Sequence, residues 1–170
     1  MKYYIGIDAS LTGTGICLMD DDHMIATHLR VDPKARRGCE RLEFILTSFR
    51  DVLHKFQGIE AAAIEGYAYG ARGHLAQLGE LGGLLRLELY CLDIPFTVVA
   101  ATSLKKYVTG SGRGDKNMML LSVYKKWGIS CADDDQADSY ALARLCCAIH
   151  EKEELLKYEQ EVVANILKKG

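Results

Sequence analysis

Five short apolar runs along the chain predict the strands of a β-sheet. The first, "YYIGI" (3–7), is apolar at consecutive positions, which is typical of a strand buried on both faces. Two runs, "GICLM" (15–19) and "MIATHLRV" (24–31), flank an acidic turn and predict a β-hairpin. The runs "AAAI" (61–64) and "FTVVA" (96–100) predict two further strands, each preceded by a longer segment.

Apolar residues at three- and four-residue spacing predict helices in the longer segments. The helix over 74–92 contains Gly79, Gly82 and Gly83, and each glycine costs a helix about 1 kcal/mol relative to alanine. Three glycines together indicate that another backbone approaches this helix closely. The predicted helices cover roughly 39–57, 74–92, the segment "TSLKKYV" (102–108), 117–127, the aspartate-rich segment that starts near 133, and 151–169.

The order of these elements predicts an α/β fold. Consecutive strands joined by short turns form an antiparallel meander, and strands reached through helices add in parallel. We therefore expect a five-stranded mixed sheet, three strands antiparallel and then two parallel, flanked by helices, with the 3–7 strand central and the 61–64 strand beside it. Two prolines, no repeat and no low-complexity linker predict that residues 1–170 form a single domain.

Composition limits the classes of function. The chain is 49% hydrophobic and 26% charged, which is typical of a globular protein. Its net charge of −2 argues against a general nucleic-acid coating protein, so a polyanionic partner must contact local basic patches. The N-terminus lacks a signal-peptide apolar region, and no apolar stretch approaches the roughly 18 residues of a membrane span. We expect a cytoplasmic protein with no membrane partner.

The six cysteines form no C-x-x-C pair. They are Cys17, Cys39, Cys91, Cys131, Cys146 and Cys147. Without paired ligands at metal-binding spacing, we interpret them as reduced thiols of the core and expect no zinc site.

Two acidic residues follow neighbouring strands of the predicted sheet. Asp8 ends the 3–7 strand and Glu65 ends the 61–64 strand. Because parallel strands bring equivalent ends together, these carboxylates should meet. Alone, each is an ordinary acid at the end of a strand. Together they repel each other unless a cation or a proton relieves the conflict.

A second acidic pair lies in the segment "DDDQADSYALARL" (133–145). Asp135 and Asp138 are three residues apart and share the helix face that continues through Leu142 toward the interior. Asp133 and Asp134 are explained as exposed acids at a helix start, where they cap free N–H groups. That explanation fails for Asp138, which lies beyond the first turn. Asp134, four residues from Asp138, shares its face too, so the choice between Asp134 and Asp135 stays open.

A cluster of four carboxylates suits a hard cation. Oxygen-only ligands favour Mg²⁺ or Mn²⁺ over zinc. Ions held by a few carboxylates, with positions open to phosphate oxygens and water, are typical of phosphodiester hydrolysis, and two ions can stabilise both the attacking and the leaving oxygen.

Basic residues gather in two parts of the chain. Segment 30–41 has five basic and two acidic residues, and segment 105–126 has six basic and one acidic residue. The loop "TGSGRGDK" (109–116) lacks the G-x-x-x-x-G-K-[ST] pattern, which argues against a nucleotide P-loop. The candidate contacts to a DNA backbone are Arg36, Arg37, Lys105, Lys106, Arg113 and Lys116.

The loop "GYAYGARG" (66–73) directly follows Glu65. Tyr67 or Tyr69 is placed to stack on an unpaired base beside the acidic site, and Arg72 is a further candidate for DNA contact. The alternative, that one of the tyrosines packs into the fold, stays open.

Four blocks of this sequence resemble the RuvC-type Holliday junction resolvases of the ribonuclease H-like superfamily. They match in order and spacing and run nearly end to end. The blocks are "IGIDASLTGTG" (5–15), "AIEGYAYG" (63–70), "SLKKYVTGSGRGDK" (103–116) and "DQADSYALA" (135–143). The family commonly has an aromatic residue three positions after its catalytic glutamate, where this chain has Ala68.

The resemblance implies a set of functional residues. Asp8, Glu65, Asp135 and Asp138 would be the catalytic metal ligands, for two Mg²⁺ ions per site with Mn²⁺ able to substitute. Lys105 and Lys116 would lie near the scissile phosphate. The helix around Gly79–Gly83 would form a two-fold homodimer contact, which presents two equivalent sites to a four-way junction. A bacterial or phage-encoded protein is implied.

The sequence therefore predicts a Mg²⁺-dependent crossover junction endodeoxyribonuclease that nicks paired strands of branched DNA. Another ribonuclease H-like nuclease, which cuts flaps, forks or RNA–DNA hybrids, is the alternative. A two-domain ATPase of the actin-like or sugar-kinase fold needs more than 170 residues. A catalytically inactive junction scaffold would be expected to lack one of the four acids.

Overall fold

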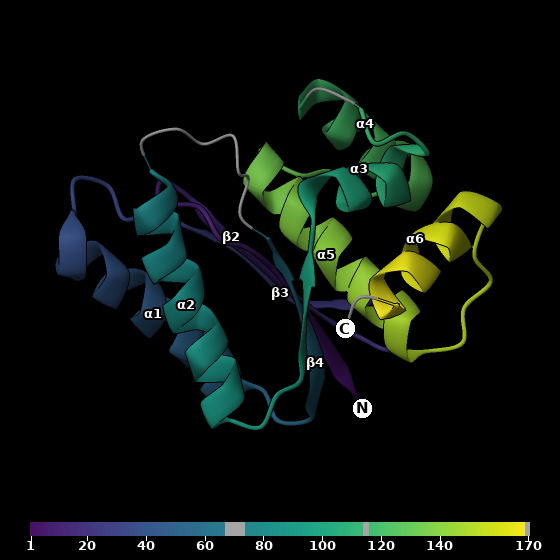
Figure 1. Ribbon diagram of the computed structural model, residues 1–170. Coiled ribbons are helices and arrows are strands. Elements are labelled where there is room, and N and C mark those ends of the chain that lie inside the picture. The colour runs from purple at the N-terminus through teal and green to yellow at the C-terminus, as the bar shows by residue number, and fades with distance from the viewer. Residues whose placement is uncertain (67–73, 114–115, 169–170) are drawn as a thin grey trace.

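The computed structural model of the protein describes residues 1–66, 74–113 and 116–168. Its five strands form one sheet in the order β3-β2-β1-β4-β5 (Figure 1). β1 is central, pairing antiparallel with β2 and parallel with β4, and β5 continues the parallel half. The predicted mixed sheet is confirmed. The strands are β1 (Tyr3–Asp8), β2 (Thr14–Asp20), β3 (Ile25–Val31), β4 (Ile59–Glu65) and β5 (Phe96–Val99).

The helices follow the predicted order. They are α1 (Gly38–Lys55), α2 (Leu75–Cys91), α3 (Ala101–Thr109), α4 (Lys116–Trp127), α5 (Asp134–His150) and α6 (Lys157–Leu167). The last helix begins at Lys157 and not near 151, because Glu151 is extended and ends α5, and the backbone N–H of Leu156 donates to Glu159 to start α6. Among the described helices, none is long and apolar enough to span a membrane.

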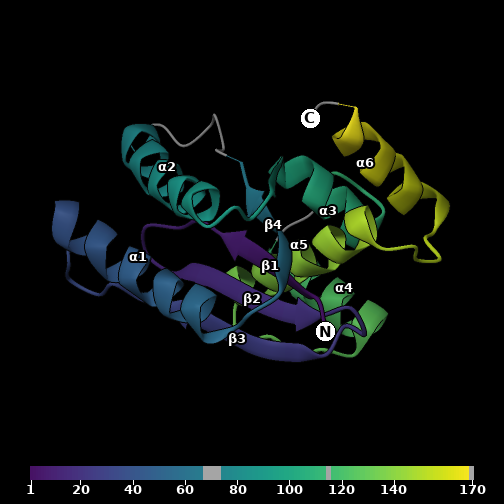
Figure 2. The same cartoon turned by 90° about the horizontal axis from the view of Figure 1, so that it is seen from below.

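The sheet is covered on both faces (Figure 2). Side chains alternate along β1, so Ile5 and Ile7 pack with α1 and α2, while Tyr4 packs with α3 to α6. Both faces of β1 are therefore buried, as its continuous apolar run predicted. Asp8 shares the face of Tyr4, which places it on the α5 side of the sheet.

Two glycines let α5 lie directly against the sheet. A Cβ atom at Gly6 would lie 2.1 Å from the carbonyl oxygen of Ser139, and one at Gly15 would lie 2.2 Å from that of Asp135. Both oxygens belong to the backbone of α5. The absence of side chains on β1 and β2 at these points brings the first turns of α5 onto the strand ends.

The cysteines are all free thiols, but not all belong to the core. Cys17, Cys146 and Cys147 are buried. Cys39 and Cys91 are exposed because they lie at the first turn of α1 and at the last residue of α2, and Cys131 is partly exposed. The prediction that all six are core thiols is therefore wrong for the exposed pair.

Candidate active site

Three carboxylates meet where β1 and β4 end beneath α5. One oxygen each from Asp8, Glu65 and Asp138 lies within 4.8 Å of the others. Asp8 and Glu65 are the last residues of adjacent parallel strands, and Asp138 is on the second turn of α5, the helix that Gly6 admits to the sheet. The convergence of these three side chains agrees with the sequence prediction.

The surroundings of this cluster oppose negative charge. Each side chain keeps some exposed surface but is largely enclosed by protein atoms. Burial, followed by the carboxylates of Glu65 and Asp138, raises the pKa of Asp8 well above its ordinary value. Burial also raises the pKa of Asp138, to about 7, with Glu65 as the next cause. Without a cation, these acids cannot all be ionised at neutral pH at low cost.

A hydrogen bond joins the carboxyl groups of Asp8 and Glu65, which would otherwise repel each other. Burial raises the pKa of Glu65, while this bond and the Lys105 ammonium lower it. Burial and the neighbouring carboxylates, together with the same bond, raise the pKa of Asp8. The pair titrates as a unit.

The donor set fits a hard divalent metal ion. Three carboxylates supply only oxygen, and a 2+ charge among them would remove the repulsion that raises their pKa values. Each of the three residues keeps some exposed surface, so the cluster is not fully enclosed. Asp8, Glu65 and Asp138 would therefore hold a metal ion and still leave coordination positions for a substrate.

Asp135 lies beside this cluster and pairs with Arg30 of β3. Its Oδ2 accepts a hydrogen bond of 2.7 Å from Arg30 Nε. Burial raises the pKa of Asp135, while the bond to Arg30 lowers it. Asp135 adds to the negative charge that raises the pKa of Asp8, so it is a neighbour of the three acids without belonging to the group within 4.8 Å.

The two preceding aspartates differ from each other. Asp133 caps α5 by accepting a 2.9 Å hydrogen bond from the backbone N–H of Gln136, as predicted, and it also lies 3.3 Å from Arg30. Asp134 raises the pKa of Asp138 more than Asp135 does. Both Asp133 and Asp134 are partly buried, so the prediction that they are exposed is wrong. Asp134 and Asp135 therefore both add negative charge beside Asp138.

Arg30 is the residue that sequence reasoning missed. It belongs to the basic segment 30–41, and its guanidinium links α5 to the loop between β1 and β2. It donates to Asp135 on α5 and to the carbonyl oxygen of Thr12 at 3.0 Å, and it lies against Gly13. Nothing in the strand pattern of 24–31 distinguishes Arg30 from a solvated cation. Its role depends on β3 lying next to the start of α5.

The predicted basic contacts are distributed unevenly. Lys105, on α3, is near enough to the cluster to lower the pKa of both Glu65 and Asp138. Lys106 instead forms a 2.9 Å ion pair with Glu161 of α6. Lys116 begins α4, but its side chain lies outside the described part of the structure.

The remaining predicted contacts lie farther along the chain. Arg36 stacks on Phe44, with its guanidinium carbon 4.1 Å from the ring centre. Arg37 precedes α1 and is exposed, and Arg113 is exposed in the loop before α4. The last three predicted contacts, Tyr67, Tyr69 and Arg72, lie outside the described residues.

The outer face of α2 carries small and then large apolar residues. A Cβ atom at Gly79 or Gly83 would meet no atom of the described chain within 4 Å. Leu87 and Tyr90 continue the same helical face and are 55% and 75% exposed. Gly82 is buried on the other side of the helix. Within the described residues, therefore, no other segment packs against α2 at Gly79 or Gly83 as closely as the sequence predicted.

This fold and this site define a class. A five-stranded mixed sheet flanked by helices, with acids at the ends of its two central parallel strands and on the helix above them, is the ribonuclease H-like α/β fold. Thermus thermophilus RuvC in complex with a Holliday junction substrate aligns with a TM-score of 0.71 and 22% identity, covering 84% of this chain and 91% of that one. The yeast mitochondrial Holliday junction resolvase Ydc2 aligns with a TM-score of 0.51 and 14% identity, over 98% and 82%.

Sequence comparison gives the family. Brucella suis RuvC is 30% identical over 151 residues, which cover 86% of this chain and 87% of the relative. Ehrlichia chaffeensis RuvC is 28% identical, over 87% and 97%. The match to Brachyspira hyodysenteriae RuvC, also 28% identical, covers 61% of this chain and 65% of the relative. No protein-family model matches the chain. The chain belongs to the RuvC family, whose members are named crossover junction endodeoxyribonucleases.

Proposed function

We propose that this protein is a Mg²⁺-dependent endonuclease that resolves four-way DNA junctions by paired nicks. The observation that carries the proposal is the convergence of Asp8, Glu65 and Asp138 within 4.8 Å in a chain of the RuvC family. The relatives are named crossover junction endodeoxyribonucleases, and the Thermus neighbour was solved with a Holliday junction substrate. Branched DNA is therefore the substrate proposed here.

The acids would hold two metal ions, with Asp134 or Asp135 as the fourth ligand. Oxygen-only donors favour Mg²⁺, and Mn²⁺ has the same preference. When bound, the ions would supply Lewis-acid activation of a water and stabilise charge on the phosphodiester. The chain's own contribution is to fix the carboxylates at the ends of two rigid strands and on a packed helix.

The cations around the cluster have separate roles in this proposal. Lys105 lowers the pKa of Glu65 and Asp138, which supports its proposed role as a contact to a phosphate beside them. Lys116, at the start of α4, is proposed as the second phosphate contact. Arg30 fixes one oxygen of Asp135 and so limits the orientations of that carboxylate.

A homodimer would bring two such sites to one junction. The face of α2 formed by Gly79, Gly83, Leu87 and Tyr90 is the proposed contact, because small residues permit close helix approach and the large apolar ones are left exposed. A two-fold axis through this face would place one site opposite each of the two equivalent strands of a junction, because the junction has the same two-fold symmetry.

Cleavage of a panel of DNA substrates tests the proposal. The protein with Mg²⁺ is incubated with a mobile four-way junction, a flap, a fork, an RNA–DNA hybrid and plain duplex, and the cuts are mapped. We expect symmetric nicks in the junction and ligatable 5′-phosphate ends. Asp8→Asn should bind the junction and cut it at least about a hundredfold more slowly, whereas Asp21→Asn, at an exposed acid, should match the wild type. Faster cutting of flaps, forks or hybrids would favour the alternative nuclease activity.

A further inference from the structure

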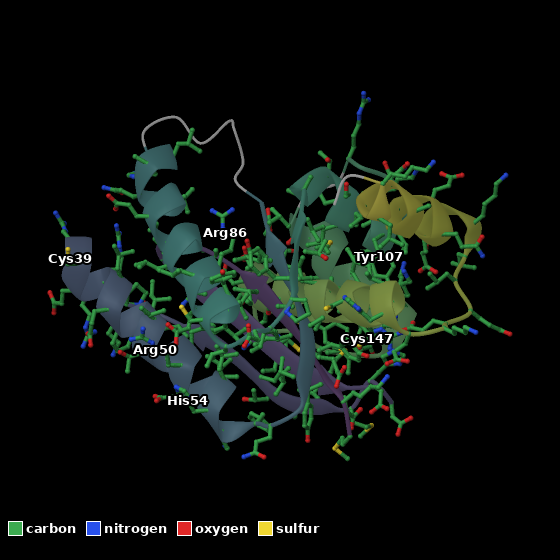
Figure 3. The ribbon with its side chains drawn as sticks, turned by 60° about the horizontal axis from the view of Figure 1, so that its bottom comes forward. Cys39, Arg50, His54, Arg86, Tyr107 and Cys147 are labelled. Atoms are coloured by element: carbon green, nitrogen blue, oxygen red, sulfur yellow. The ribbon has the colours of Figure 1, made fainter. Side chains whose placement is uncertain are left out.

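A second group of metal-ligating side chains lies at the other end of α5. One atom each from His23, Cys147 and Glu153 lies within 4.8 Å of the others. Cys147 is nine residues beyond Asp138 on α5, about 14 Å along the helix axis. This group shares no residue with the carboxylate site. Figure 3 labels Cys147 on α5.

The three side chains come from three separate segments. His23 is in the turn between β2 and β3, Cys147 is in the last turns of α5, and Glu153 is in the connection from α5 to α6. His23 Nε2 lies 2.9 Å from Glu153 Oε1. The Cys147 thiol points at the carbonyl oxygen of Asp20, 4.0 Å away. The sequence prediction against a zinc site relied on the absence of paired cysteines, whereas this group contains one cysteine with a histidine and a glutamate from other segments.

The turn that carries His23 is held in a fixed and uncommon conformation. His23 has a φ of +64°, in the left-handed region that few residues other than glycine adopt. The buried Asp20 stabilises the turn, because its Oδ1 accepts hydrogen bonds from the backbone N–H groups of Asp22 at 3.0 Å and Met24 at 2.8 Å. The imidazole is therefore aimed at Glu153 and Cys147 by the backbone.

We propose that His23, Cys147 and Glu153 form a Zn²⁺ site that joins these three segments. Imidazole nitrogen, thiolate sulfur and carboxylate oxygen are the ligands zinc prefers, whereas Mg²⁺ prefers oxygen alone. Nitrogen and sulfur ligands of a tetrahedral zinc ion lie about 3.6 Å apart, so separations within 4.8 Å need only small side-chain movements. The carbonyl oxygen of Asp20 or a water would complete the four ligands.

The surroundings of the site allow an ion to enter and keep the ligands available. The His23 side chain is 26% exposed and that of Glu153 is 13% exposed, so solvent reaches the site from their side. Arg144 lies 3.7 Å from Oε2 of Glu153, which leaves Oε1 to face His23. Zinc binding would displace the thiol proton of Cys147 to solvent.

Cobalt binding tests the proposal, because Co²⁺ occupies zinc sites and absorbs visibly. Co²⁺ is titrated into metal-depleted protein in excess Mg²⁺, which fills the carboxylate site. We expect one Co²⁺ per chain with a thiolate-to-cobalt charge-transfer band, which oxygen ligands do not produce. Cys147→Ser should abolish the band. Cys39→Ser, at an exposed thiol outside the group, should retain it. No band in the wild type, or a band that survives Cys147→Ser, would overturn the proposal.

A second variant separates loss of the site from loss of folding. His23→Asn removes the imidazole, and asparagine tolerates the positive φ of this turn. We expect this variant to fold with a wild-type circular dichroism spectrum and to bind Co²⁺ at least about tenfold more weakly. Zn²⁺ should raise the melting temperature of the wild type and of His54→Asn, at an exposed histidine of α1, but not that of His23→Asn. An equal rise in melting temperature in all three proteins would show that His23 and Glu153 form only an ion pair and do not bind zinc.

Discussion

At the scale of single residues, the acids of the proposed metal site lie where burial disfavours their charged form. The pKa of Asp138 rises from 3.8 to about 7. Between these two values the unfolded chain releases a proton that the folded chain keeps, so the folded state binds more protons and its stability falls as the pH rises. A bound divalent cation reverses this effect, because it favours the ionised carboxylates.

The first prediction concerns stability without metal. With a chelator present, the unfolding free energy of the wild type should fall by an amount on the order of 1–3 kcal/mol as the pH rises from 4 to 7. The unfolding free energy of Asp138→Asn should fall less over the same range. Adding Mg²⁺ at pH 8 should raise the melting temperature of the wild type and have little effect on Asp138→Asn. Thermal denaturation across this pH range measures both effects, with Asp21→Asn as the control. A wild type that gains stability with pH over this range would contradict the assignment of buried charge.

The second prediction concerns Arg30, which holds Asp135 through a 2.7 Å hydrogen bond. Arg30→Gln leaves Asp135 free to rotate, and loss of such a supporting bond typically weakens metal binding about 10- to 100-fold. We expect a corresponding increase in the Mg²⁺ concentration that gives half-maximal junction cutting. The control is Lys152→Gln, at an exposed cation that is not a candidate DNA contact. If Arg30→Gln leaves the Mg²⁺ dependence unchanged while Asp134→Asn abolishes cutting, the fourth ligand is Asp134.

The limits of sequence reasoning are clearest at this scale. The carboxylates at the ends of β1 and β4 were predictable because parallel strands align their ends, and Asp138 because it lies past the first helical turn on an inward face. The pairing of Arg30 with Asp135 was not, because it depends on the exact position of α5 over β3. The ligands from His23 and Glu153 likewise lie 124 and 6 residues from Cys147 in the chain, and no local pattern connects them.

At the scale of secondary structure, the position of α5 determines the geometry of the site. Apolar periodicity predicted every strand and the approximate range of every described helix, since most elements bury one face. It placed the start of α6 too early. Residues 151–156 contain charged and then apolar residues, as an amphipathic helix does, so the sequence pattern does not distinguish this extended connection from a helical turn. The close contact of α5 with Gly6 and Gly15 was likewise not predictable from a pattern.

The third prediction follows from that contact. A Cβ atom at Gly6 would lie 2.1 Å from one backbone atom of α5 and 2.3 Å from another, so Gly6→Ala must displace the helix. We expect a loss of about 1–3 kcal/mol in unfolding free energy and a large loss of junction cutting, because Asp138 moves with α5. Chemical denaturation and cutting assays measure these. Gly112→Ala, whose Cβ would have its nearest neighbour at 3.5 Å, should unfold like the wild type. Unchanged cutting in Gly6→Ala would contradict this role for α5.

At the scale of the whole molecule, the two covered faces of the sheet serve different purposes. The face covered by α5 carries the acids of the proposed metal site, and α1 and α2 cover the other face. The sequence suggested a dimer contact through all three glycines of α2. The structure separates them, since Gly82 is buried against the chain's own core and Gly79 and Gly83 face outward.

The fourth prediction tests the proposed homodimer. Gly83→Glu places a charge on the outer face of α2 where the described chain leaves space, so folding should be retained. We expect sedimentation to show a shift toward monomers and the variant to nick junctions without pairing the cuts. Gln57→Glu, at an exposed position before β4, should sediment as the wild type does. A dimer that persists in Gly83→Glu would place the contact elsewhere.

The most direct test of the account is single-turnover cutting of a labelled four-way junction by Asp138→Asn in Mg²⁺, with junction binding measured in the same samples. The carboxylate is the one on α5 that completes the group with Asp8 and Glu65. We predict binding within a few-fold of the wild type and a cutting rate at least about a hundredfold lower. Cutting at the wild-type rate would contradict the claim that these three acids form the catalytic metal site.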